Sequence, residues 1–91
     1  MTDREQPGRA RFKTRDLALA TYLNLRGHRH SRMERLHAFG YWFFDRDASL
    51  DKLVMDYKAG VAKVEPREFV RTLASVREEL FAFLNGAPAG K

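Results

Sequence analysis

The 91-residue sequence contains no cysteine, which excludes disulfide bonds and thiolate metal sites and allows a reducing compartment. It also lacks any long apolar run, so we expect neither a signal peptide nor a membrane span. A glycine-rich phosphate loop, a nucleophile elbow and an HExxH motif are missing as well. These absences predict a cytoplasmic protein with no membrane association that is not an enzyme, with no catalytic residue and no cofactor.

The positive charge lies in one half of the chain. The net charge is +5, and residues 1–46 contain ten Lys and Arg against five Asp and Glu. Residues 47–91 contain seven of each kind and are neutral overall. One-sided positive charge attracts polyanions such as nucleic acids without selecting one of them. The alternative is that the charge only promotes solubility.

Three segments have the pattern of helices. The first is expected to open at Thr14, whose hydroxyl can accept an amide of the first turn, and to end at Gly27. The second follows the cap residue Asp47 and carries an apolar stripe at i, i+3, i+4 and i+7 before Gly60 ends it. The third starts at Pro66, since proline is tolerated at the first helical position.

Between the first two helices, β-formers and aromatic residues predict a hairpin with strands at residues 29–35 and 41–45. Residues 61–64 are a candidate third short strand. The predicted fold is α+β, a single small domain in the order α-β-β-α-α, with the β-hairpin packed with three helices. The domain should cover residues 12–85, between a disordered basic arm at residues 1–11 and a flexible tail at residues 86–91.

Four consecutive aromatic residues, YWFF, occupy positions 41 to 44 of the second strand. Strand alternation places Trp42 and Phe44 on one face, and Phe39, Tyr41 and Phe43 on the other. Two interpretations stay open. Helices cover both faces, or one face is left for a dimer, a partner groove or the stacking of bases. If one face is open, we expect it to be that of Tyr41 and Phe43.

A basic cluster adjoins these rings and favours nucleic-acid binding. Arginine holds phosphate through a bidentate fork, and exposed aromatic rings stack unpaired bases with about 1–3 kcal/mol per base. The alternative is a charged edge strand that prevents pairing with other sheets. The residues predicted to bind nucleic acid are Arg9, Arg11, Lys13, Arg26, Arg29, Arg32, Arg35, Tyr41 and Phe43.

Two further groups of polar residues are candidate sites. His28 and His30 would lie on the same side of a strand and could bind a metal, with His37 nearby. No carboxylate stands at a characteristic spacing, so exposed histidines are favoured and no metal ligand is assigned. Asp45 and Asp47 form a close acidic pair, but Asp47 is expected to cap a helix.

The sequence resembles a family of small uncharacterised domains from bacteria, archaea and tailed phages, over roughly residues 12–84. The resemblance rests on the segments FKTRDLALATYLNLRGH, YWFFDRD and KVEPREFVRTLASVREEL. The matching residues are Lys13, Thr14, Asp16, Leu17, Leu19, Ala20, Trp42, Phe44, Asp45, Val64, Pro66, Arg67 and Phe69, with Trp42 in place of a phenylalanine. This resemblance supports the fold boundaries and implies no catalytic or binding residue.

Two functions therefore stay open. The first is a small nucleic-acid-binding accessory protein, in which the basic arm and strand hold phosphates and the adjacent rings stack bases. The second is a protein–protein interaction module, a homodimer or a phage-type adaptor, which uses the second aromatic face of the hairpin. The charge asymmetry favours the first.

Overall fold

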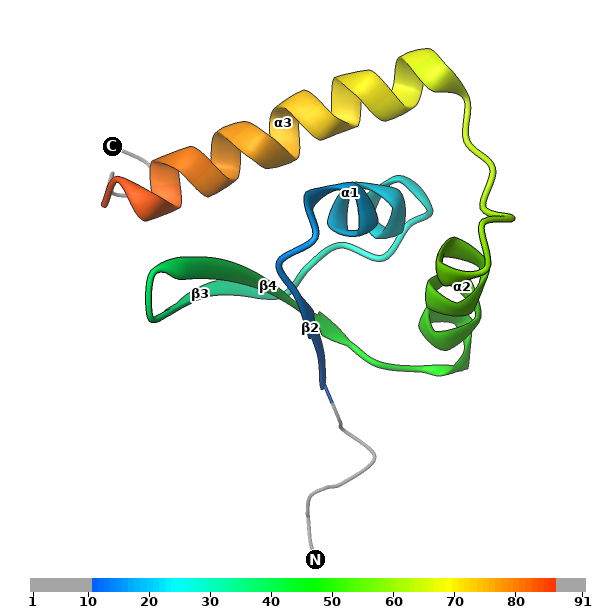
Figure 1. Ribbon diagram of the computed structural model, residues 1–91, viewed down its shortest axis with the longest axis horizontal. Helices are drawn as coiled ribbons and strands as arrows, with labels where there is room; N and C mark the ends of the chain where they lie inside the picture. The colour runs from blue at the N-terminus through cyan, green and yellow to red at the C-terminus, as the bar shows by residue number, and fades with distance from the viewer. Residues whose placement is uncertain (1–10, 87–91) are drawn as a thin grey trace, which may run out of the picture.

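The computed structural model describes residues 11–86, and these form a three-stranded sheet with three helices, the first and third over one side of the sheet and the second beside its end (Figure 1). The α+β class is thereby confirmed. None of the helices between residues 11 and 86 could span a bilayer, since none combines sufficient length with sufficient hydrophobicity. In chain order the elements are β2 (Arg11–Thr14), α1 (Leu17–Leu25), β3 (Arg32–Leu36), β4 (Phe39–Asp45), α2 (Ala48–Lys58) and α3 (Pro66–Leu84).

The sheet is antiparallel with the strand order β2-β4-β3, so β4 lies in the centre. The β3–β4 hairpin was predicted, although its strands run from Arg32 to Leu36 and from Phe39 to Asp45. Strand β2 was not predicted, because four residues with two half-buried side chains are too short to show a period. Residues 61–64 form no strand, which corrects the third strand expected there.

Residues His37 and Ala38 make the two-residue turn of this hairpin. His37 has a φ of 59°, the only positive φ among the non-glycine residues from 11 to 86. A positive φ at the first central residue is typical of the turns whose twist matches that of the flanking strands. The turn thereby fixes the hairpin register without the Asn-Gly or Asp-Gly pair that usually signals it.

The helix starts are fixed by carboxylate caps. Helix α1 begins after Asp16, whose Oδ1 accepts the amide of Leu19 at 3.1 Å. Thr14, expected to be this cap, instead ends β2 and accepts the amide of Asp16 at 3.0 Å. Asp47 caps α2 as predicted, since its Oδ1 accepts the amide of Leu50 at 2.8 Å. The third helix starts at Pro66 as predicted, with the Glu65 side chain as its cap.

One hydrophobic core lies between the sheet and the helices. The central strand contributes Trp42 and Phe44, both fully buried. Helices α1, α2 and α3 add buried residues to the same cluster, including Leu23, Leu50 and Val76. All three helices therefore share one core with Trp42 and Phe44, and the second aromatic face lies outside this cluster.

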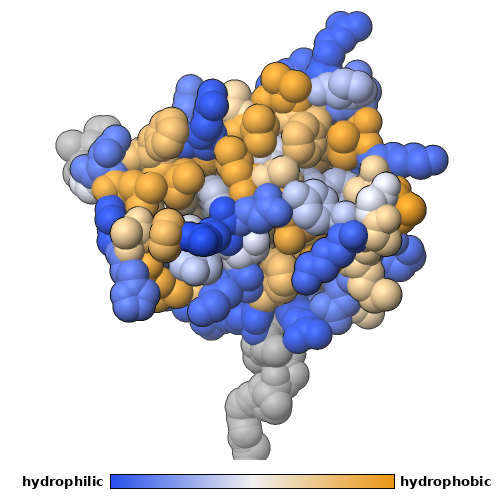
Figure 2. Space-filling model, in the orientation of Figure 1, coloured by the Kyte–Doolittle hydropathy of each residue, from blue (hydrophilic) through white to orange (hydrophobic). Residues whose placement is uncertain are grey.

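Exposed apolar residues also occur on the outer side of the helical layer. Val70 and Phe81 of α3 are both more than half exposed. Figure 2 shows hydrophobic residues over the upper part of the view, where Figure 1 places α3, separated by hydrophilic side chains. Such mixed composition is ordinary for a solvent-facing helix.

Gly40 lets α3 pass close over the hairpin. A Cβ added at this position would lie 2.8 Å from Cδ1 of Leu80 and 3.3 Å from Cδ2 of Leu84. A distance of 2.8 Å is below ordinary van der Waals contact, so a larger side chain must push the helix or its leucines aside. The glycine therefore serves packing here, as an inward-facing position of β4 with no room for a side chain.

Replacing Gly40 with valine should lower the free energy of unfolding by about 1–3 kcal/mol, because the added methyl groups overpack the contact with α3. Urea denaturation of the G40V variant measures this loss. In the background of L80A, which makes room beside Gly40, G40V should cost less than it does alone. Equal costs in both backgrounds would show that the contact with Leu80 is unimportant.

Candidate nucleic-acid interface

The face of the sheet opposite the helices carries three aromatic rings. Phe39 is 49% exposed, and Tyr41 and Phe43 are half-buried. None of the three belongs to the hydrophobic core or packs against it. The strand registers place further residues on this side of the sheet, and Arg15, which follows β2, joins them through its contact with the Phe39 ring. We call this surface the open face; its residues are Arg11, Lys13, Arg15, Arg32, Glu34, Leu36, Phe39, Tyr41, Phe43 and Asp45.

Each ring of the open face has a basic side chain over it. The register explains two of these contacts, because Lys13 and Arg32 are the cross-strand partners of Phe43 on its two sides. A diagonal neighbour is also within reach of a long side chain, which brings Lys13 to the next ring along β4. The cation–ring pairs are Lys13 Nζ with Tyr41 (5.4 Å to the ring centroid), Arg15 Cζ with Phe39 (3.8 Å) and Arg32 Cζ with Phe43 (4.6 Å).

The open face is positively charged. It carries four basic side chains, from Arg11, Lys13, Arg15 and Arg32, and two carboxylates, from Glu34 and Asp45. Nε of Arg32 donates to Oε2 of Glu34, which leaves the three basic residues at the β2 edge as the larger group. Cation–ring contacts at exposed sites contribute only about 0.5–1 kcal/mol each, so these side chains can exchange partners at little cost.

The structure brings together five of the predicted nucleic-acid-binding residues and separates three. Arg11, Lys13, Arg32, Tyr41 and Phe43 share the open face. Arg9 lies outside the described residues. The remaining three contact the helical side of the molecule, which corrects their assignment to one surface. Their partners are the Lys63 carbonyl for Arg26 (3.4 Å), Glu79 for Arg29 (3.9 Å) and the Leu84 carbonyl for Arg35.

Arg15 was missed from the sequence. It follows Arg11 and Lys13 at intervals of two, which is the spacing of one strand face. This signal went unused because residues 14–16 were taken as the start of a helix. Its guanidinium makes the closest of the three cation–ring contacts.

A family model described as a domain of unknown function, DUF5659, matches residues 9–82 of the chain. The chain belongs to the DUF5659 family. The match confirms the resemblance to an uncharacterised domain, and it includes β2 and therefore the whole open face. No curated protein and no solved structure matches the chain.

The histidines of this DUF5659 domain do not converge on a metal site. His28 and His30 precede β3 instead of lying within it, so the expected alternation does not apply. Nε2 of His28 lies 3.0 Å from the Ser49 hydroxyl at the start of α2, and Nε2 of His30 lies 3.1 Å from Glu79 on α3. Within residues 11–86, no group of three or more histidine and carboxylate side chains could hold a metal ion.

His30 connects the segment before β3 to the long helix. Its side chain is 9% exposed, and its ring meets the buried ring of Phe44 edge-on at 6.2 Å. Burial lowers the pKa of His30 below 6.5, and the positive charge of Arg29 lowers it further. The carboxylate of Glu79 acts in the opposite direction but is outweighed. The ring is therefore neutral in the folded protein at neutral pH.

Acid should destabilise the fold through His30. Because its folded pKa lies below 6.5, the unfolded chain takes up the proton first as the pH falls. The stability contributed by the neutral ring is complete above pH 6.5 and is lost as the pH falls from there toward the folded pKa. Urea denaturation between about pH 5 and 7.5 measures this slope, which should be smaller in H30Q. An unchanged slope in H30Q would contradict the assignment.

Proposed function

We propose that this protein binds single-stranded nucleic acid across the open face. The proposal is supported mainly by one observation: three rings of one strand each lie under a basic side chain from a neighbouring segment. The rings supply flat surfaces for bases, and the basic groups supply charge for phosphates. Both chemistries were expected from the sequence, and the shared face supports their joint use.

The spacing of the rings favours an extended single strand over a duplex. Alternate residues of a strand are separated by about 6.8 Å, twice the rise of about 3.4 Å per residue. The phosphates of one strand in a duplex follow each other at about 3.4 Å along the axis, with the bases paired and stacked. Bases can reach successive rings only if the nucleic acid is unpaired and its bases are spread apart. Such stacking tolerates any sequence, because every base has an aromatic face.

The basic side chains have two roles in this proposal. In the free protein they cover the rings, as Arg15 does at 3.8 Å from the centroid of Phe39. When a base arrives, an arginine either leaves the ring for a phosphate or keeps its place and stacks on the base itself. Arg11 stands beside these pairs at the β2 edge and extends the charged surface toward the N-terminus.

A protein interface on the same face is the second candidate function, favoured by the exposure of Phe39 at 49% next to two further rings. A homodimer or a phage-type adaptor would cover the rings with apolar surface and leave the basic groups at its rim. In sedimentation equilibrium, an apparent mass that rises with concentration from that of a monomer to that of a dimer would indicate a homodimer. Together with a lack of nucleic-acid binding, this result would favour the second function over the first. The cytoplasmic location and the phage relation stay predictions from the sequence.

Replacing the three basic residues at the β2 edge, Arg11, Lys13 and Arg15, with glutamine should weaken nucleic-acid binding and also reduce its salt dependence. For a single strand, the logarithm of the binding constant falls with the logarithm of salt concentration with a slope of about −0.7 for each phosphate neutralised. Four basic groups predict a slope of about −3, and one remaining group predicts about −1. Fluorescence anisotropy with a labelled oligonucleotide measures both slopes. The variant is R11Q/K13Q/R15Q.

A matched control removes the same charge from the other side of the molecule. Three arginines of α3, a helix that contributes to the core and not to the open face, are exposed, and their replacement should leave both affinity and slope close to those of the wild type. If the two triple variants lose binding equally, net charge alone explains the affinity and the open face is not the site. The control variant is R67Q/R71Q/R77Q.

Removing the rings should reduce affinity without changing the salt slope. In Y41L/F43L, leucine keeps apolar bulk but offers no flat ring, which should cost about 1–3 kcal/mol for each base stacked. The preference for a single strand over a hairpin duplex of the same sequence should shrink in parallel. Unchanged affinity for the single strand would remove stacking from the proposal and leave only the charge.

A further inference from the structure

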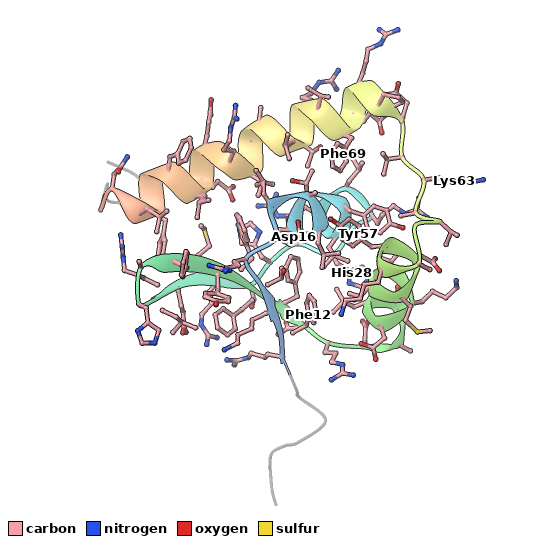
Figure 3. The ribbon with its side chains drawn as sticks, viewed as in Figure 1. Phe12, Asp16, His28, Tyr57, Lys63 and Phe69 are labelled. Atoms are coloured by element: carbon pink, nitrogen blue, oxygen red, sulfur yellow. The ribbon has the colours of Figure 1, made fainter. Side chains whose placement is uncertain are left out.

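A second site lies on the helical side of the molecule, away from the open face. Residues from all three helices and from the connection between α2 and α3 line a pocket of about 260 Å³. We call it the aromatic pocket; its lining residues are Tyr22, Tyr57, Gly60, Ala62, Val64 and Phe69. Figure 3 shows Tyr57 beside Asp16, with Phe69 above them on α3 and Lys63 directed away from the molecule.

The aromatic pocket has the size and the walls for one flat ring. A closed apolar cavity of about 150 Å³ is known to hold benzene, whereas pockets for larger ligands occupy about 300–1,000 Å³. The rings of Tyr22 and Tyr57 are nearly parallel, with centroids 6.2 Å apart and planes at 28°. Phe69 contributes a third ring, and the rest of the lining is glycine, alanine and valine. An apolar ring fits these walls better than a nucleobase, whose polar edges would find few partners.

The carboxylate of Asp16, next to the aromatic pocket, already accepts hydrogen bonds from the protein. One oxygen of Asp16 accepts the amide of Leu19 at 3.1 Å, and the other accepts the hydroxyl of Tyr57 at 3.0 Å. Burial raises the pKa of Tyr57, and the hydrogen bond to the Asp16 carboxylate raises it further, so this hydroxyl stays a neutral donor. Asp16 therefore orients the tyrosine and has no oxygen without a protein partner.

A cation stands at the edge of the aromatic pocket. The guanidinium of Arg26 lies 5.9 Å from the centroid of Tyr22 and donates to the Lys63 carbonyl at 3.4 Å. The guanidinium thus connects Tyr22, which lines the pocket, with the segment between α2 and α3, which also lines it. Its side chain is exposed, and among residues 11–86 the structure shows no ion pair for it. Four of its five N–H groups can still bind a ligand.

We propose that the aromatic pocket binds a small aromatic carboxylate. The ring enters between the tyrosines and Phe69, and the carboxylate pairs with Arg26 at the edge through the bidentate geometry that arginine favours. The walls select the ring, and the guanidinium of Arg26 selects the negative charge. This site shares no residue with the open face and does not depend on nucleic-acid binding.

The test is a titration of the ¹⁵N-labelled full chain, followed by NMR, with 3-phenylpropionate and with its neutral amide. Both probes carry the same ring, so they differ only in charge. Amide signals of Tyr22, Tyr57 and Gly60 should shift, and the acid should bind about three- to tenfold more tightly than the amide, as expected for a partly exposed charged hydrogen bond. In R26Q the two probes should bind equally, while the ring still shifts the same signals.

The matched control is R77Q, which removes an exposed arginine of α3 outside the lining and should keep the preference for the acid. Three outcomes would overturn the proposal. The lining signals stay unchanged with both probes, the amide binds as well as the acid to the wild type, or R26Q keeps the full preference. Because R26Q changes an exposed side chain, its amide spectrum without probe should match the wild type and establish that the variant is folded.

Discussion

The placement of β4 in the centre of the sheet determines the rest of the molecule. Hydrogen-bonded on both sides, this strand cannot shift by one residue without exchanging its two sets of aromatic rings. In the observed register Gly40, Trp42 and Phe44 meet the helices, and the ring positions between them are left outside. The core and the open face therefore both follow from the alternation of side chains along β4. A shift in the register of this strand would change both at once.

Within the described residues, the excess positive charge of the first half of the chain is divided between the two sides of the sheet in the folded domain. Basic residues of β2 and β3 reach the open face from the two edges of the sheet, where each edge strand flanks the aromatic centre. Other arginines of the same half, at positions 26, 29 and 35, turn toward the helices and contact carbonyl or carboxylate oxygens there. A count of charges along the sequence predicts the excess but cannot divide it between two sides of the domain, because that division depends on where each strand begins.

The fold class, the hairpin, the three helices and the open face of Tyr41 and Phe43 could be predicted, since each depends on local periodicity or capping. Strand β2 was missed because the alternation of Arg11, Lys13 and Arg15 is too short to identify a strand without its pairing with β4, which lies far along the chain. Missing β2 also hid Arg15 and misplaced the helix start at Thr14. The aromatic pocket combines four segments, so its existence depends on packing that no single stretch of sequence reveals.

The edge position of β2 has a dynamic consequence. Its pairing with β4 closes a long loop, while the β3–β4 hairpin closes a two-residue turn, so β2 costs more chain entropy for fewer cross-strand pairs. We therefore expect β2 to open before the β3–β4 hairpin in local unfolding, so that its amide protons exchange with solvent earlier. Arg11 and Lys13 lie on this strand. A polyanion that binds these two residues only when β2 is paired therefore also stabilises the pairing of β2 with β4. Binding at the open face would in this way reduce local unfolding of the sheet.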